Sequence, residues 1–325
     1  MNILVTGATG FIGSHLVEAL LKRKYHVACL VRKTSNLRWL TGLDVELVYG
    51  ELSNPADIEK AIAGRDYFYH LAGVTKAFTK EEYFKGNYQS TKTLMETCAN
   101  SRHSLKKILH VSSLAAAGPS LDGTPLREDC ACKPVTWYGE SKLQAEAAIL
   151  PFMDKLPITI VRPPIVYGPR DTDVFDYFKT IKCGIRLLTG RGKKYSIVYV
   201  EDLVEGILSA CETPVSAGRI YYIADPRIYE WENIADAIKK TIGRRTITLN
   251  MPHCVIGLAA RVNENICKCF NKKTIFNRQK AMEILQPNWV CDTAKATAEL
   301  HFAPKYTLEQ GIQKTYEWYK ENKWL

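Results

Sequence analysis

No stretch of this sequence is apolar over the roughly 18–20 residues that a membrane-spanning helix needs. The first twenty residues carry neither a basic leader nor a cleavage site, and the chain has no internal repeat and no low-complexity linker. These absences argue against a membrane-spanning, secreted or fibrous protein. With 325 residues, of which 46% are hydrophobic, the composition predicts a globular cytoplasmic protein of one large or two modest domains.

Zinc-binding spacing is also absent, although the chain has ten cysteines. The cysteines are scattered, and the two C-x-C pairs, Cys130/Cys132 and Cys267/Cys269, differ from the C-x-x-C spacing of common zinc sites. We therefore predict free thiols in a reducing compartment and no metal site.

Long basic tracts are missing despite a net charge of +10. Lysine and arginine occur in short pairs such as Lys193-Lys194 and Arg244-Arg245, without interleaved aromatic residues and without a DNA-binding motif. The sequence therefore predicts no nucleic-acid partner. Most of the charge is expected on the solvated surface, and the expected partner is a small-molecule substrate. A homodimer remains open.

A glycine-rich turn at the N-terminus is the most informative feature that the sequence does have. Gly7, Gly10 and Gly13 follow an apolar run with G-x-x-G-x-x-G spacing and open a predicted helix. Glycines at these places permit a tight turn, close approach of the backbone to a pyrophosphate, and close packing of helix on strand. The positive end of the helix would then bind the phosphates. The candidate cofactor-binding residues of this turn are Gly7, Thr9, Gly10, Phe11, Ile12 and Gly13.

A second motif, Tyr138-Gly139-Glu140-Ser141-Lys142, has Y-x-x-x-K spacing at the start of a helical stretch. Residues four apart share a helix face, so the phenol of Tyr138 and the ammonium of Lys142 point to the same place. A tyrosine ordinarily titrates near pH ~10, and a neighbouring lysine charge together with a nicotinamide cation would lower its pKa. Ser113, at the predicted end of a strand, would hold a substrate oxygen beside the tyrosine. The candidate catalytic residues are Ser113, Tyr138 and Lys142.

With these motifs the chain resembles the extended short-chain dehydrogenase/reductase family over essentially its whole length. His70-Leu71-Ala72-Gly73 is similar to the family's H-x-A-G segment, Asn87 falls where the family carries a helical asparagine, and Arg162–Pro169 is similar to the segment that flanks the nicotinamide. The resemblance implies catalysis by the three residues named above. It also implies cofactor contacts from Leu71, Ala72, Gly73, Asn87, Tyr138, Lys142, Pro163 and Ile165.

Predicted strands and helices alternate through the first two-thirds of the chain. The expected strands are Asn2–Val5, His26–Val31, Val45–Tyr49, Tyr67–His70, Lys107–Ser112, Ile158–Val161 and Ile220–Ile223. The expected helices are His15–Lys24, Pro55–Ala63, Lys80–Cys98, Tyr138–Met153 and Asp202–Cys211. Strands separated by helix-length segments predict an α/β fold with a doubly wound parallel sheet (Rossmann). Ligands bind at the carboxyl ends of such strands, which adds Glu51 and Leu52 to the candidate cofactor-binding residues.

Beyond about residue 170 the alternation ends, which predicts a smaller, mostly C-terminal substrate-binding domain. The expected NADP-binding domain comprises residues 1–168 with 196–224. The expected substrate-binding domain comprises residues 169–195 with 225–325.

Within the second domain, Pro252–Phe270 has apolar residues at three-to-four spacing, as is typical of an amphipathic helix. We expect this helix to pack over the smaller domain. The alternatives are an apolar lid over the substrate, or contact with a membrane surface helped by Lys268, Lys272 and Lys273. The aromatic C-terminal tail, Tyr316–Leu325, is expected to be helical and to pack rather than to catalyse.

No acidic residue follows the second predicted strand, where an NAD-preferring fold carries an Asp or Glu for the ribose 2′-hydroxyl. The chain has Arg32 and Lys33 there, and its next acidic residue is Asp44. A guanidinium binds a 2′-phosphate as a fork, whereas a carboxylate would repel it. We therefore favour NADP(H) over NAD(H), with Arg32 and Lys33 as cofactor-binding residues.

The family resemblance leaves several reaction classes to compare. Ser113 is followed by Leu114–Ala117, without the acid that dehydratases of the family carry, so dehydration is not expected. Epimerases of the family carry a diphosphate-binding asparagine where this chain has Pro164, and an arginine where it has Tyr195. Three nearby cations could substitute for that arginine and keep the epimerase alternative open, namely Arg191, Lys193 and Lys194.

The R-P-P-x-x-Y-G-P segment is closer to the 3β-hydroxysteroid dehydrogenase and dihydroflavonol reductase branch of the family. The expected function is therefore an NAD(P)-dependent oxidoreductase that moves hydride between nicotinamide and a secondary alcohol or ketone, with Tyr138 as acid and base. The substrate would be a hydroxysteroid- or flavonol-like small molecule. The alternatives are a nucleotide-sugar epimerase with a transient keto intermediate, and a non-catalytic dinucleotide-binding regulator. Regulators of this kind typically lack the motif's tyrosine or lysine, and this chain keeps both.

Overall fold

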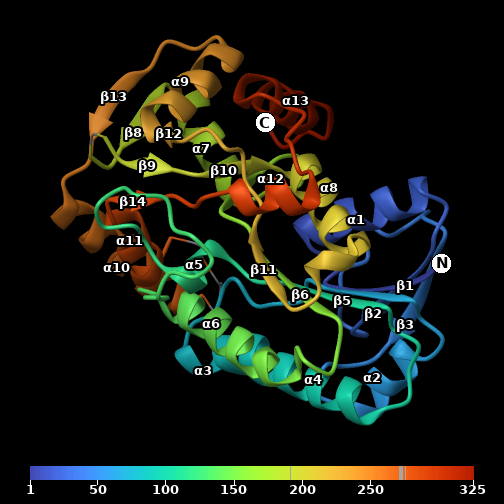
Figure 1. The fold of residues 1–325 in the computed structure, drawn as a ribbon. Coiled ribbons are helices and arrows are strands. Elements are labelled where there is room, and N and C mark those ends of the chain that lie inside the picture. Colours follow the sequence, from blue (N-terminus) through green and yellow to red (C-terminus); the bar gives the residue numbers. More distant parts are fainter. Residues whose placement is uncertain (191, 271–273, 275) are drawn as a thin grey trace.

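A seven-stranded parallel sheet forms the largest layer of the protein (Figure 1). The computed structural model describes residues 1–190, 192–270, 274 and 276–325. In spatial order the strands of this sheet are β11 (Arg219–Tyr222), β6 (Ile158–Arg162), β5 (Lys107–Val111), β4 (Tyr67–His70), β1 (Asn2–Thr6), β2 (His26–Val31) and β3 (Val45–Tyr49). Every neighbouring pair is parallel, and the strand order reverses between β1 and β4. The predicted doubly wound α/β fold is confirmed.

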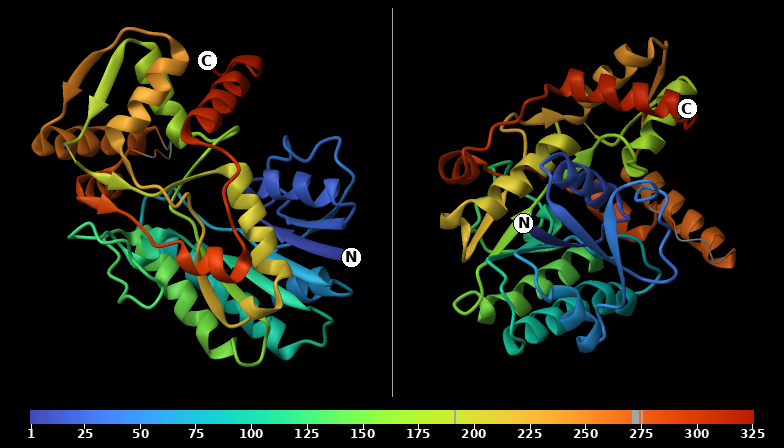
Figure 2. Two further views of the ribbon diagram at one scale, coloured as in Figure 1. Left: turned by 45° about the horizontal axis from the view of Figure 1, so that its top comes forward. Right: turned by 90° about the vertical axis from the view of Figure 1, so that its right-hand side faces the viewer.

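Helices cover both faces of the sheet (Figures 1 and 2). The α-helices are α1 (Phe11–Lys22), α2 (Pro55–Ile62), α3 (Lys80–Tyr83), α4 (Ser90–Asn100), α5 (Leu114–Ala117), α6 (Trp137–Ile149), α7 (Asp173–Lys182), α8 (Val200–Glu212), α9 (Trp231–Ile242), α10 (His253–Cys269), α11 (Arg278–Leu285), α12 (Ala294–Leu300) and α13 (Leu308–Glu321). Shorter helical segments are the π-helical η1 (Phe84–Gln89) and the 3-10 turns η2 (Leu150–Phe152) and η3 (Pro214–Ser216).

The side chains of β1 point alternately to the two faces of the sheet, which shows why the inner strands are mostly apolar. Ile3 and Val5 are buried in one cluster with side chains of α1 and α8. Leu4, between them, is buried in a second cluster with side chains of α2 and α4. Successive residues of a strand point to opposite faces, so a sheet covered on both faces needs apolar residues at every position. The helices thereby fix the strand ends that carry the candidate site.

A smaller lobe is built mainly from the C-terminal half of the chain (Figure 2). It contains the three-stranded sheet β12 (Tyr229–Glu230), β9 (Lys194–Tyr195) and β14 (Asn288–Trp289), and the pair β8 (Ile185–Leu188) and β13 (Ile247–Asn250). A further parallel pair consists of β7 (Ile165–Tyr167), which follows β6, and β10 (Ile197–Tyr199), which follows β9. α13 packs against α9, and its Tyr319 is fully buried beside Phe178 of α7. The expected packing of the aromatic tail is confirmed.

All ten cysteines are free thiols, as predicted. Within the described residues, no group of three or more His, Cys, Asp or Glu side chains could hold a metal ion. None of the helices described is long and apolar enough to cross a membrane.

Candidate active site

The glycine-rich turn joins β1 to α1 in a tight backbone loop. Gly7 has φ of 73°, in the left-handed region that favours glycine, and the Gly10 N–H donates to the Gly7 carbonyl oxygen at 3.0 Å. A Cβ on Gly13 would lie 2.1 Å from the same oxygen, so α1 packs on β1 at a distance that only glycine allows.

The N-terminus of α1 is shaped to receive an anion. The helix begins at Phe11, and among the described residues no side chain caps its N–H groups and no acid stands in its first turn. Uncapped N–H groups at the positive end of a helix bind negative charge. The residues present therefore fit the pyrophosphate of a dinucleotide.

The loop after β4 closes against this turn. Thr6 Oγ1 and His70 Nδ1 are hydrogen-bonded at 2.8 Å, and the same hydroxyl accepts the Ala72 N–H at 3.4 Å. A Cβ on Gly7 would lie 2.6 Å from the carbonyl carbon of Leu71, so the two loops are in direct contact. The candidate residues of the glycine turn and of the segment Leu71–Gly73 thus form one surface at the carboxyl end of the sheet.

Asn87 connects the loop after β4 to α6. It lies in η1, a π-helical segment of the kind often found at functional sites. Its Oδ1 accepts the Val74 N–H at 2.7 Å, and its Nδ2 donates to Val74 O at 3.0 Å and to Ser141 Oγ at 2.8 Å. Asn87 therefore positions both segments, and its contact with a cofactor stays a prediction.

Gly139 allows α6 to come close to the short helix α5. A Cβ on Gly139 would lie 2.3 Å from the carbonyl oxygen of Ala115, a backbone atom that cannot easily move away. Thr136 caps α6 at this point, its Oγ1 accepting the Gly139 N–H at 3.1 Å. The sequence analysis missed the packing role of Gly139 and the capping role of Thr136. The threonine two residues before Tyr138 is nevertheless a recognisable capping signal.

This close packing places Ser113 beside Tyr138. Ser113 is the N-cap of α5, and its Oγ accepts the Ala115 N–H at 3.1 Å. The Ser113 side chain lies near enough to the Tyr138 hydroxyl to favour its phenolate form. Two of the three predicted catalytic residues, 25 residues apart in the sequence, therefore lie close together.

Burial raises the pKa of Tyr138 to about 12, while the Ser113 side chain acts in the opposite direction. The carboxylates of Glu283 and Asp173 raise this pKa further. For the protein without a cofactor the pKa of Tyr138 is therefore raised, and its lowering by Lys142 together with a nicotinamide cation stays a prediction. Removal of water disfavours the phenolate, and this effect depends on packing that the motif does not encode.

Lys142 lies one turn further along α6 and is buried, with only 5% of its surface exposed. Its Nζ donates to the carbonyl oxygen of Val111, at the end of β5, at 2.7 Å. Burial lowers the pKa of Lys142 to about 8, and the nearby carboxylate of Glu146 opposes this effect. At pH 7 the side chain is therefore mostly an ammonium ion.

A buried ion pair lies behind Lys142 and was missed by sequence reasoning. Arg162, the last residue of β6, donates from Nε to Glu146 Oε1 at 3.0 Å and from Nη2 to Oε2 at 2.6 Å. Ser112 Oγ donates to the same carboxylate. The i, i+4 spacing of Lys142 and Glu146 on α6 is the signal that could have found it. The next residue, Pro163, accepts the Leu114 N–H at 2.8 Å and so holds β6 against α5.

The candidate cofactor-binding residues Arg32, Lys33, Glu51 and Leu52 lie at the carboxyl ends of β2 and β3. Arg32 and Lys33 directly follow β2 and are exposed. The Glu51 N–H donates to Asp57 Oδ2 at 2.9 Å, and Leu52 packs against the apolar cluster on one face of the sheet. Ile165 begins β7, next to the R-P-P segment.

Of the three cations that could replace a diphosphate-binding arginine, the two that the structure describes do not form a shared anion site. Lys193 is buried and donates to Ile284 O at 2.6 Å, while Lys194 is exposed on β9. Arg191 lies outside the described residues. Tyr195 is buried with its ring edge-on to Trp231, 5.6 Å between centroids. Tyr195 thus belongs to an apolar, aromatic core cluster.

Two contacts join the smaller lobe to the large domain around Tyr138. Gln279 on α11 accepts the N–H of Trp137, the residue before Tyr138, at 2.7 Å. Asp173 at the start of α7 pairs with Lys76 at 3.4 Å. The elements α7 and α11 therefore border the catalytic residues.

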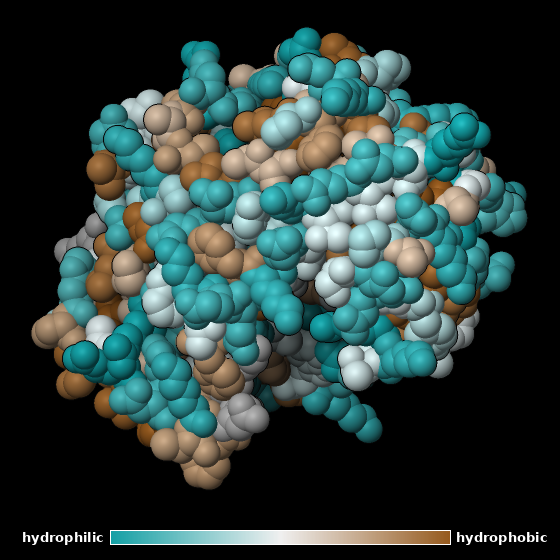
Figure 3. All heavy atoms as spheres, turned by 90° about the horizontal axis from the view of Figure 1, so that it is seen from below, coloured by the Kyte–Doolittle hydropathy of each residue, from teal (hydrophilic) through white to brown (hydrophobic). Residues whose placement is uncertain are grey.

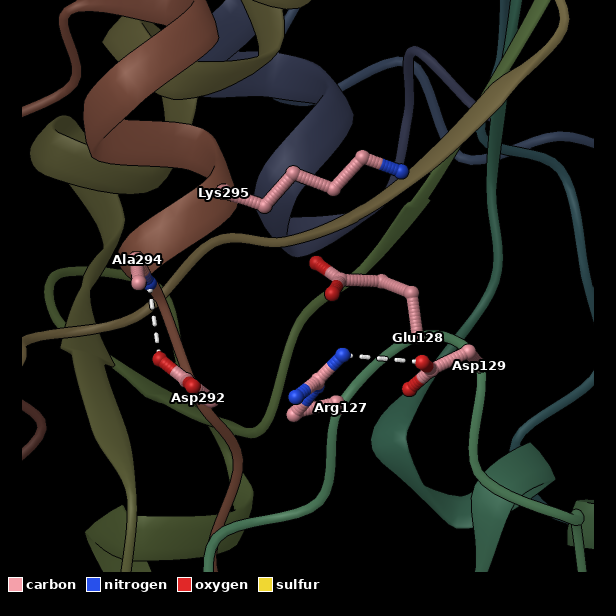
Figure 4. A pocket seen from close by; sticks show the side chains of 6 residues that line it. All are labelled: Arg127, Glu128, Asp129, Asp292, Ala294 and Lys295. Atoms are coloured by element: carbon pink, nitrogen blue, oxygen red, sulfur yellow. Dashed lines mark hydrogen bonds and ion pairs between the residues drawn. The ribbon is translucent and has the colours of Figure 1, made fainter.

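The pocket in Figure 4 lies elsewhere, between residues 127–129 and the start of α12. Its charged side chains already have partners: Arg127 pairs with Asp129 at 2.9 Å, and Lys295 Nζ donates to Ile220 O at 3.0 Å. None of the candidate site residues lines it. We do not place the reaction there.

The chain is similar to known proteins over most of its length. Residues 3–224 match the model of the NAD dependent epimerase/dehydratase family. A ceramide reductase of Caulobacter vibrioides is 28% identical over 99% of this chain and 96% of its own. A decarboxylating sterol-4-alpha-carboxylate 3-dehydrogenase of Dictyostelium discoideum is 25% identical over 96% of this chain and 98% of its own. The structure of Bacillus cereus UDP-glucuronic acid 4-epimerase with UDP-glucuronic acid and NAD is 25% identical, covers 99% of this chain and 100% of its own, and has a TM-score of 0.78.

Proposed function

The chain belongs to the NAD dependent epimerase/dehydratase family of extended short-chain dehydrogenases/reductases, a family of enzymes, and we propose that it interconverts a secondary alcohol and a ketone on an uncharged, hydroxysteroid-like lipid. The placement of Ser113 beside Tyr138 by the close packing of α5 and α6, with Lys142 one turn away, carries the proposal. Tyr195, buried among apolar and aromatic side chains where epimerases of the family carry an arginine, supports an uncharged substrate. The names of the ceramide and sterol relatives agree with this class.

In the proposed mechanism the chain's own residues handle the proton and the oxygen. When bound, the nicotinamide would accept or supply the hydride. Ser113 would hold the substrate oxygen, and Tyr138 would pass a proton to or from it. The ammonium of Lys142 would stabilise the developing phenolate and so offset the effect of burial on the Tyr138 pKa.

The cofactor proposed is NADP(H), held at the glycine turn with its 2′-phosphate on Arg32 and Lys33. Both cations are exposed at the carboxyl end of β2, where a guanidinium can reach the phosphate as a fork. We also propose that residues 1–168 with 196–224 bind the cofactor and that residues 169–195 with 225–325 bind the substrate.

Replacing Tyr138 by phenylalanine tests the chemistry. We expect Tyr138→Phe to abolish turnover of a ketosteroid or hydroxysteroid while the cofactor Kd stays nearly unchanged, because only a hydroxyl is removed. The matched control is Tyr83→Phe, whose ring centroid lies 6.2 Å from that of Tyr138 and whose hydroxyl donates to Thr75 O. The control should retain activity. A Tyr138→Phe enzyme with a near-normal rate would refute the assignment.

The second candidate function is a nucleotide-sugar epimerase, which the likeness to the UDP-glucuronic acid 4-epimerase structure favours. Loss of the diphosphate-binding asparagine and arginine, replaced by Pro164 and Tyr195, argues against it. Calorimetry with UDP-sugars separates the two functions. Tight binding at ordinary salt would favour the epimerase over the lipid oxidoreductase.

A further inference from the structure

Exposed apolar side chains concentrate at one end of the smaller lobe. In the described part of the chain, nine of the fifteen exposed large apolar residues belong to β8, β13, α10 and α11 or directly follow them. They are Ile185, Ile247, Leu249, Val255, Leu258, Val262, Ile266, Phe270 and Met282. Brown and tan side chains also gather at the lower left of Figure 3. A clustered apolar surface of this kind marks an interaction site rather than ordinary surface.

The helix α10 turns an apolar row outward. Ile256 and Ala260 are buried against Ala281 of α11 and fix the orientation of the helix. On another side of α10, four side chains and the Phe270 that caps its C-terminus are between 40% and 78% exposed. We call this row the α10 face, and it consists of Val255, Leu258, Val262, Ile266 and Phe270. The expected packing of the helix over the lobe is therefore only half correct, because most of its apolar side chains are left uncovered.

Positive charge borders the α10 face. Arg261 is exposed, while Lys268 and Arg278 share the single carboxylate of Glu264, at 2.6 and 3.7 Å. Among these described groups cations outnumber acids by three to one. Lys272 and Lys273, also expected to help, lie outside the described residues. Apolar residues flanked by cations are typical of helices that lie on anionic lipid, whereas two copies of this face would bring like charges together.

The opposite side of α10 is linked to the candidate active site through α11. α10 packs on α11, and Gln279 of α11 contacts the backbone of Trp137 beside Tyr138. We propose that the α10 face docks on the surface of an anionic membrane, so that the active site takes its lipid alcohol or ketone from the bilayer. The uptake of a lipid alcohol or ketone from the bilayer rests on the proposed function, whereas the docking on the membrane does not.

Sedimentation with lipid vesicles tests the docking without any substrate. The full chain is mixed with phosphatidylcholine vesicles, with or without phosphatidylglycerol. We expect the wild type to sediment with the anionic vesicles, and less so at high salt. The double variant Leu258→Asp/Ile266→Asp should bind at least about tenfold more weakly, because two charges enter the apolar face. The matched control is Leu121→Asp, which changes a side chain that is 72% exposed in a loop elsewhere and should bind as the wild type does.

Three results would overturn the docking proposal. The wild type could stay in the supernatant, the double variant could bind as well as the wild type, or light scattering could show a wild-type dimer that the double variant dissociates. Unfolding temperatures should be alike, since the altered side chains are exposed. If the wild type binds vesicles but reduces or oxidises no lipid ketone or alcohol, the docking stands and the proposed function fails.

Discussion

Replacing Lys142 by methionine would separate the catalytic value of its buried ammonium from its cost to folding. Burial lowers the pKa of Lys142 from 10.5 to about 8, a difference that corresponds to roughly 3 kcal/mol at 1.36 kcal/mol per pH unit. Below pH 8 the folded protein carries a charge that its surroundings disfavour, so this cost is fully present. Between pH 8 and 10.5 the unfolded chain binds more protons than the folded one, and the stability therefore rises with pH.

Methionine has a similar length and no charge, so Lys142→Met removes this cost. It also removes the hydrogen bond to Val111 O, which contributes about 1 kcal/mol. At pH 7 we expect the variant to be more stable than the wild type by about 2 kcal/mol. It should be inactive, because the ammonium beside Tyr138 is gone. By pH 10 most of the gain in stability should have disappeared.

Urea unfolding of both proteins between pH 6 and pH 10 measures the effect. The quantity to follow is the difference in unfolding free energy between the two proteins. Buried tyrosines such as Tyr221 change the stability of both proteins with pH in the same way, so their effect cancels in this difference. Lys60→Met, an exposed change on α2, is the control and should alter stability little at any pH. A difference that stays constant from pH 7 to pH 10 would refute the reasoning about burial. Full activity in Lys142→Met would refute its catalytic role.

Two further predictions concern the cofactor and the geometry of the site. Arg32→Asp should weaken NADP(H) binding by about ten- to a hundredfold and shift preference toward NAD(H), because a charge-assisted contact is lost and a carboxylate repels the phosphate. Fluorescence titration with both nucleotides checks this, and equal wild-type affinities would contradict it. Gly139→Val should lower kcat roughly a hundredfold with little change in cofactor Kd, since its Cβ would lie 2.3 Å from Ala115 O and would push Tyr138 away from Ser113. Unchanged steady-state kinetics would show that α6 can shift without consequence.

The large sheet could be predicted from the sequence because burial on both faces leaves a plain signal. The strands His26–Val31, Val45–Tyr49 and Tyr67–His70 begin and end where they were expected. Each is an apolar run closed by turn residues. The strands of the smaller lobe, such as Lys194–Tyr195 and Asn288–Trp289, have two residues each and carry no periodicity that could reveal them.

The candidate site also has parts that could be predicted from the sequence and parts that could not. The glycine turn and the Y-x-x-x-K spacing are local, so the sequence shows them directly. Contacts between distant segments, such as Gly139 on Ala115 and Asn87 on Ser141, depend on how the helices pack. The raised pKa of Tyr138 in the protein without a cofactor could not be predicted for the same reason, because the water around a hydroxyl is removed by the whole fold.

The buried charges beneath Tyr138 explain why this part of the core is polar at all. Without a carboxylate nearby, burial would lower the pKa of Lys142 further and leave less of the ammonium form at neutral pH; Glu146 counteracts this. A lone buried carboxylate is costly, so Arg162 and Ser112 must satisfy it. An apolar replacement of the whole group would be at least as stable, yet it would remove the charge that we propose acts on Tyr138. Selection for the proposed reaction, rather than for stability, would account for this arrangement.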